Sequence, residues 1–248
     1  MEQQNYQYQD DSVFVIQEGS VSKKFFANVF LWMFVALSVS TAAAIFTNQI
    51  PGIQSLIRDE ATLKPTILGY IATFAPLGLV LLMGAGFGRL SFNTLLGVFI
   101  LFSLLLGVSL SSILIFYQLG SVVACFVAAA GIFGIMAFLG YTTEVDLSKF
   151  GPILMVGVIG LVIASVVNMF IGSSQFDYIM SFFGVAIFTA LTAYDVQKIK
   201  RIGLGLEENG QQIGSNDSKK LAIMAALSLY LDFINIFLFL LRIFGSRK

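Results

Sequence analysis

Residues 226–245 read ALSLYLDFINIFLFLLRIFG, a nearly unbroken apolar run that contains one acid, Asp232. At ~1.5 Å per residue, a helix of this length crosses the ~30 Å hydrocarbon layer of a bilayer. A charged carboxylate at the centre of that layer costs about 2.5–3.5 kcal/mol unless it is paired, hydrated or protonated. The stretch therefore predicts a membrane-spanning helix that carries a functional acid.

A second acid follows the same pattern in the preceding apolar stretch. Residues 188–200 read FTALTAYDVQKIK, and Asp195 lies just before the basic end of this segment. Intramembrane acids are rare and mark ion or proton pathways. Two of them on consecutive spans predict a centre that handles protons or cations.

The composition of the whole chain is that of an integral membrane protein. Of its 248 residues 57% are hydrophobic and only 11% are charged, whereas soluble domains carry about 25% charged residues. The formal net charge is zero, and no basic tract alternates with aromatic residues, which argues against a nucleic-acid partner. The single cysteine, Cys125, excludes an intrachain disulfide. Because the chain has no histidine, any pH sensing near neutrality must come from carboxyl groups.

Apolar runs predict an all-α, polytopic bundle of seven transmembrane helices. Residues 1–25 are polar and lack the basic start of a secretory signal, so we expect a flexible N-terminal tail. Residues 26–248 are expected to form one seven-helix transmembrane domain. The predicted spans are 26–46, 66–88, 92–117, 120–140, 151–171, 178–199 and 221–244.

Lysines and arginines predict the orientation of these spans. With seven spans, nine of these residues fall on the side of the N-terminus and five on the other side. The positive-inside rule then places the N-terminus in the cytoplasm. We expect a multi-pass protein of a bacterial inner membrane, with the lipid bilayer as its partner.

Geometry brings the two acids toward each other. If the sixth helix continues past Lys200 into residues 202–204, Asp195 and Asp232 reach a similar depth. Antiparallel helices packed about 8–10 Å apart would let the carboxyl groups approach, and such a pair shares a proton as a unit. Arg89 ends the second span on the same side, where it could pair with the acids or extend to the headgroups. Nearby side chains that could hydrogen-bond the acids are Tyr194, Gln197, Tyr230 and Asn235.

Several of these segments resemble the Bax inhibitor-1 (transmembrane Bax inhibitor motif) family. They are YDVQKIK at the end of the sixth span, LSLYLDFINIFLFLLRIFG in the seventh, and GYTTEVDL at 140–147. The resemblance covers roughly residues 20–248. It implies a pH-gated calcium-leak channel, with Ca²⁺ and protons as partners and no catalytic residue, cofactor or bound metal. It also implies pH-sensing roles for Asp195 and Asp232 and a latch role for Arg89.

Other functions stay open beside the channel. A proton-coupled secondary transporter would also use intramembrane acids, although the chain shows no internal repeat. An intramembrane aspartyl protease would use the acids as a dyad, but Leu229-Tyr230-Leu231 stands where that class has Gly-x-Gly before the acid. A structural or partner-binding membrane protein would leave two acids in hydrocarbon unexplained. A retinal photoreceptor is excluded because the seventh span has no lysine for a Schiff base.

Overall fold

The computed structural model describes residues 19–59, 62, 64–209 and 215–248. This part of the chain is almost entirely helical and contains no β-strand beyond two isolated bridges, which confirms the all-α prediction. The helices are α1 (Ser20–Gln49), α2 (Pro51–Ile57), α3 (Ile67–Gly86), α4 (Phe92–Phe116), α5 (Leu119–Thr142), the 3-10 helix η1 (Leu147–Phe150), α6 (Gly151–Ile171), α7 (Ser174–Glu208) and α8 (Asn216–Phe244).

Seven of the described helices, α1 and α3 to α8, are long and apolar enough to cross a membrane. The seven predicted spans are thereby confirmed, with differences at their ends. Helix α1 begins at Ser20, inside the predicted tail, because Phe25 is fully buried and lies near Gly203 of α7. The remainder of that tail, residues 1–18, lies outside the described residues. The short helix α2, between α1 and α3, was not predicted.

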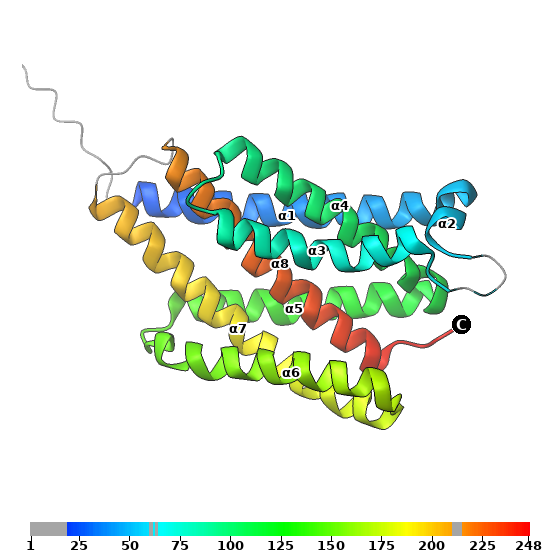
Figure 1. Ribbon diagram of the computed structural model, residues 1–248. Helices are drawn as coiled ribbons and strands as arrows, with labels where there is room; N and C mark the ends of the chain where they lie inside the picture. Colours follow the sequence, from blue (N-terminus) through cyan, green and yellow to red (C-terminus); the bar gives the residue numbers. More distant parts are fainter. Residues whose placement is uncertain (1–18, 60–61, 63, 210–214) are drawn as a thin grey trace, which may run out of the picture.

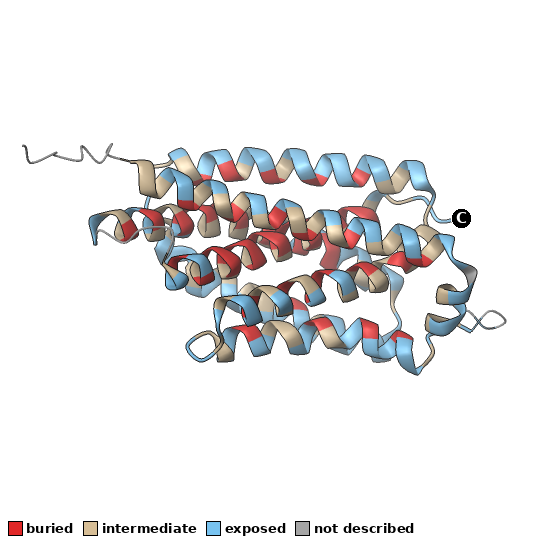
Figure 2. Cartoon of the chain, turned by 90° about the horizontal axis from the view of Figure 1, so that it is seen from above, coloured by how far each residue is buried: buried red, intermediate tan, exposed pale blue. Residues whose placement is uncertain are grey.

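Helix α8 forms the centre of the bundle. Of the 18 most apolar consecutive residues of α8, 72% are buried. The corresponding share is 6% in the span that contains α6, so α6 lies at the periphery. Helices α1, α4, α5 and α7 pack around α8, while α3 lies against α4 and α6 against α7 (Figure 1). Figure 2 shows the same arrangement, with buried residues gathered along the inner faces of the helices. The most buried helix thus carries the predicted acid Asp232.

Small residues permit the closest helix contacts. A Cβ atom at Gly107 of α4 would collide with the backbone of Ser40 in α1, and one at Gly140 of α5 would collide with the backbone of Ala193 in α7. Lipid supplies no hydrophobic drive for helices to associate, so bundles rely on such close packing of small residues. These two contacts fix α4 against α1 and α5 against α7.

The two ends of the bundle differ in charge. One end carries the α3–α4 turn, the α5–η1 loop and the end of α7, and it holds nine lysines and arginines (Figure 1). We call it the basic end. The other end, called the far end, carries α2 and the C-terminal residue Lys248, and it holds five. The prediction that the N-terminus faces the cytoplasm rests on this difference, through the positive-inside rule.

Candidate functional site: two acids between α7 and α8

Helices α7 and α8 pack against each other along the centre of the bundle, and this contact brings the two predicted acids together. Asp195 and Asp232 are near enough for the charges of their carboxyl groups to interact. Helix α7 continues through residues 202–204 to Glu208, as the predicted approach required. Along their helices Asp195 lies ~20 Å from Glu208 and Asp232 lies ~24 Å from Asn216, so the acids reach a similar depth from the basic end.

The carboxyl group of Asp232 is buried without full hydrogen bonding. The residue is 4% exposed, and its Oδ2 atom has no hydrogen-bond partner among the described residues. Among the described residues, Thr189 Oγ1 of α7 is the other buried side-chain oxygen or nitrogen atom without a hydrogen-bond partner. An unsatisfied buried polar group costs about 1–3 kcal/mol. Such a cost inside a membrane-spanning bundle is expected at a functional site rather than at a structural one.

The four polar side chains predicted beside the acids form contacts elsewhere. The Tyr194 hydroxyl lies against Gly151, and Asn235 Nδ2 donates to the Leu231 carbonyl of its own helix at 2.7 Å. Gln197 and Tyr230 bond to other helices or loops. None of the described hydrogen bonds of these side chains reaches Asp195 or Asp232. For Tyr194, Gln197 and Tyr230 the reason is helical geometry, because residues one or two positions apart point to different faces. Asn235 is three positions from Asp232, and its amide bonds to the backbone of its own helix instead.

Gln197 holds the loop between α5 and η1 against α7. Its Nε2 atom donates to the Val145 carbonyl at 2.7 Å, and its Oε1 atom accepts from the Leu147 backbone N–H at 2.8 Å. One turn farther along α7, Arg201 forms a 2.5 Å ion pair with Asp146 of the same loop. The loop that resembles the family pattern is therefore clamped to the helix that carries Asp195.

Arg89 does not pair with either acid in this structure. Its side chain is exposed in the α3–α4 turn, and none of the ion pairs of the described residues involves it. Phe87 of the same turn lies under the Lys220 ammonium, 4.9 Å from the ring centroid. Lys220 stands ~18 Å before Asp232 along α8, which is beyond the reach of an arginine side chain. The latch role of Arg89 stays a prediction for another conformation.

Two cations on the helices that carry the acids were not singled out from the sequence. Lys198, on the turn that follows Asp195, interacts electrostatically with that carboxyl group. Lys220 is only 8% exposed and lies 3.7 Å from Asp217. A lysine so close to the start of α8 is expected to lie exposed at the membrane interface. The structure instead buries it, with its ammonium over the Phe87 ring of the α3–α4 turn.

Comparison with known proteins identifies the family. Residues 22–248 match the family model described as inhibitor of apoptosis-promoting Bax1. The chain belongs to the Bax inhibitor-1 family. It is 40% identical to an uncharacterized protein of Borreliella burgdorferi over 94% of this chain and 96% of that protein. The inner membrane protein YbhL of Escherichia coli is 38% identical over 94% and 96%, and an uncharacterized protein of Rickettsia prowazekii is 38% identical over 91% and 91%. The resemblance seen in the sequence and the membrane assignment are both confirmed.

This Bax inhibitor-1 chain also has a hydroxyl cluster that sequence reasoning missed. Tyr230 is fully buried, and its hydroxyl lies 2.7 Å from Ser40 Oγ of α1. Ser40 Oγ lies 2.6 Å from the Ser103 carbonyl of α4. The cluster joins α1, α4 and α8 two residues before Asp232. Serines within the first and third apolar spans were the available signal, but nothing in the sequence paired them with Tyr230.

One prediction concerns the clamp between the α5–η1 loop and α7. Hydrogen bonds from Ser148 and the Arg201 guanidinium lower the pKa of Asp146 to about 2. A carboxyl group with a lowered pKa stabilises the fold above its ordinary value and loses this effect as the pH falls through about 2. Asp146 therefore stays ionised between pH 5 and 8. We expect Asp146→Asn to change the unfolding midpoint by the same amount at pH 5 and at pH 8, measured by thermal unfolding in detergent. A difference between the two pH values would contradict this assignment.

Proposed function

We propose that this Bax inhibitor-1 family member is a calcium-leak channel of the membrane whose opening depends on pH. One observation carries the proposal: the buried Asp232 carboxyl group has an oxygen without a partner and lies beside Asp195, in two helices that can cross a membrane. Carboxylate oxygens are the ligands that Ca²⁺ prefers. A membrane protein that keeps an unpaired carboxylate oxygen beside a second carboxyl group at its centre is suited to cation passage.

The chemistry of the pair favours passage over tight binding. Ca²⁺ takes about 6–8 oxygen ligands when it is held firmly, and the described residues contain no group of three or more His, Cys, Asp and Glu side chains that could hold a metal ion. Two carboxyl groups would attract a calcium ion yet release it, as conduction requires. Protons compete for the same oxygen atoms, so protonation of the pair would alter the leak.

Gating requires a change from this closed arrangement. Asp232 is nearly inaccessible, and the α3–α4 turn with Arg89 lies at the level of Lys220. A latch formed by Arg89 would need this turn to move toward the acids. The proposed orientation places the basic end, and with it the N-terminus, in the cytoplasm.

Calcium flux into liposomes tests the proposal. Purified full-length protein is reconstituted in liposomes that contain a calcium-sensitive dye, and entry is followed between pH 5 and 8. We expect downhill calcium entry that does not saturate and that changes with pH. Entry no faster than into protein-free liposomes at every pH would overturn the proposal. Saturable entry that is accelerated by calcium on the opposite side would indicate the proton-coupled transporter instead.

A further inference from the structure

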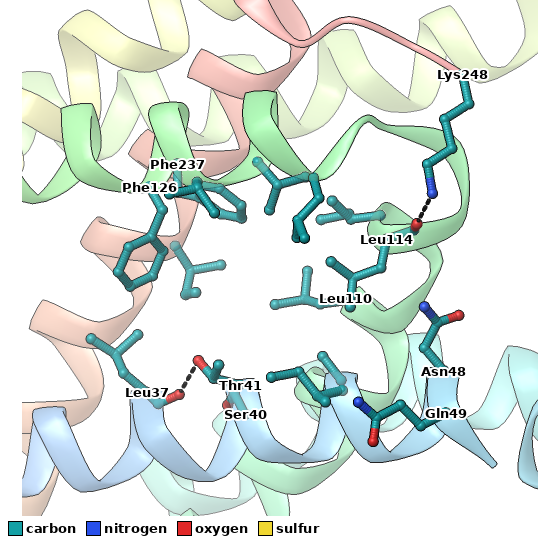
Figure 3. Close-up of a pocket in the computed structure, with 17 residues that line it drawn as sticks. Leu37, Ser40, Thr41, Asn48, Gln49, Leu110, Leu114, Phe126, Phe237 and Lys248 are labelled. Carbon is teal, nitrogen blue, oxygen red and sulfur yellow. Dashed lines mark hydrogen bonds between the residues drawn. The ribbon is translucent and has the colours of Figure 1, made fainter.

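A cavity of about 570 Å³ lies in the far half of the bundle, and neither of the two acids lines it. Helices α1, α4 and α5 form its walls, and α8 contributes Ile234 and Phe237 (Figure 3). Helices α1 and α5 both pack on α8 but have little contact with each other. Ile45 of α1 and Leu119 of α5 line the cavity and are 42% and 65% exposed. The cavity therefore opens sideways between α1 and α5, where a membrane protein meets lipid.

Aromatic contacts close the gap between the same two helices on the basic side. The rings of Phe26 and Tyr141 lie 4.8 Å apart, and those of Phe30 and Phe133 lie 6.4 Å apart. Each pair joins α1 to α5. The opening is thus confined to the far half of the bundle and has a closed inner end.

The two ends of the cavity differ in polarity (Figure 3). Leu37, Phe126 and Phe237 surround one end, whereas the side-chain amides of Asn48 and Gln49 and the Lys248 ammonium lie at the other. Lys248 Nζ donates a 2.8 Å hydrogen bond to the Leu114 carbonyl at this polar end. An apolar pocket with a cationic mouth is complementary to an amphiphile that has an apolar tail and an anionic head.

The shape and position of the cavity select among possible occupants. Its volume falls within the ~300–1,000 Å³ of ligand pockets. A helix about 10–12 Å across takes up about 500 Å³ with each 5.4 Å turn, so the cavity has room for only about one turn of a helix from a second copy. A soluble polar ligand would bury its polar groups against leucine and phenylalanine without partners. An acyl chain is as apolar as these walls and is abundant at the opening.

We propose that the cavity binds one acyl chain of a bilayer phospholipid whose phosphate group is bound by Lys248. The ammonium would exchange its bond to the Leu114 carbonyl for a charge-assisted bond to a phosphate oxygen, which is stronger. The amides of Asn48 and Gln49 lie where they can donate to the ester oxygens of the lipid. Neither acid lines this site, and the proposal does not depend on calcium conduction.

Lipid retention tests the tail site. Full-length protein is extracted in mild detergent and washed, and bound phospholipid is counted by native mass spectrometry. We expect one retained phospholipid per chain. Ala44 lines the cavity, so Ala44→Trp should fill it and abolish retention. Ala42 lies two residues away on the exposed face of α1 and outside the cavity. Ala42→Trp is therefore the matched control and should retain the lipid.

Titration with phospholipid tests the headgroup site. We expect Lys248→Gln to raise the phospholipid concentration for half-occupancy about tenfold, the effect of losing one charge-assisted bond. Arg58 is the control, because it is a cation of the same end that lies 5.0 Å over the Phe116 ring and does not line the cavity. Arg58→Gln should leave the half-occupancy concentration unchanged.

Several outcomes would overturn the proposal. Equal phospholipid retention by Ala44→Trp and Ala42→Trp would exclude the cavity as the tail site. Retention of a free fatty acid in place of phospholipid would exclude the phosphate contact, and a dimer lost only in Ala44→Trp would indicate a second copy as the occupant. If Ala44→Trp does not fold, Val123→Trp fills the cavity from α5 and is judged by the same retention measurement.

Discussion

Replacing both membrane acids, Asp195→Asn together with Asp232→Asn, should abolish the pH dependence of calcium flux and lower the flux itself. The chain has no histidine, so the interacting carboxyl pair is its proton-binding group in the membrane-spanning core. Two unit charges about 4 Å from a cation contribute on the order of 4 kcal/mol each at an effective dielectric constant near 20. Loss of even part of this attraction lowers the flux at least about tenfold. The measurement is calcium entry into liposomes between pH 5 and 8.

A matched double variant separates this effect from a general change of charge. Asp146 and Asp177 each pair with an arginine outside the α7–α8 centre, at 2.5 Å to Arg201 and 3.4 Å to Arg242. Asp146→Asn with Asp177→Asn removes the same number of negative charges. It should keep the parent's pH profile, since neither carboxylate lies beside Asp232. If the Asp195→Asn, Asp232→Asn protein keeps the parent's profile and flux, the acid pair is not the switch.

Long apolar runs made the fold predictable, and the depth of the acids depended on packing. The basic residues after Asp195 ended the predicted sixth span near residue 199, yet α7 continues to Glu208. Leu206 is buried, and Gly203 lies close to Ser22 of α1. This contact between helices far apart in sequence stabilises the extra turns of α7. A hydropathy pattern describes each segment separately and contains no information about that contact.

The neighbours of the polar side chains could not be predicted either, because they too depend on how the helices pack. Gln197 follows Asp195 by two residues in the sequence, but its side chain bonds to the α5–η1 loop. Arg89 was placed correctly at the basic end, although its distance from Asp232 depends on the packing of Phe87 against Lys220. Sequence position fixes the end of the bundle at which a side chain lies. It does not fix the neighbour toward which that side chain points.

The contact of α5 with α7 gives the second large prediction. A Cβ atom at Gly140 would collide with the carbonyl oxygen and the Cα atom of Ala193. Backbone atoms cannot turn aside as a flexible side chain would, so α5 has to move away from α7. We expect Gly140→Ala to lower the free energy of unfolding by about 1–3 kcal/mol. In thermal unfolding of the detergent-solubilised protein, each kcal/mol corresponds to a midpoint shift of roughly 2–4 °C.

A substitution six residues earlier on the same helix, at Gly134, is expected to raise the free energy of unfolding. Gly134 has no atom within 4 Å of an added Cβ, so Gly134→Ala gains helix propensity of up to about 1 kcal/mol without a clash. Equal midpoint shifts for the two variants would show that α5 and α7 do not meet at Gly140. Ala193 stands two residues before Asp195, so displacement of α7 at this contact also moves the acid. Gly140→Ala should therefore alter the pH profile of calcium flux, whereas Gly134→Ala should leave it as in the parent protein.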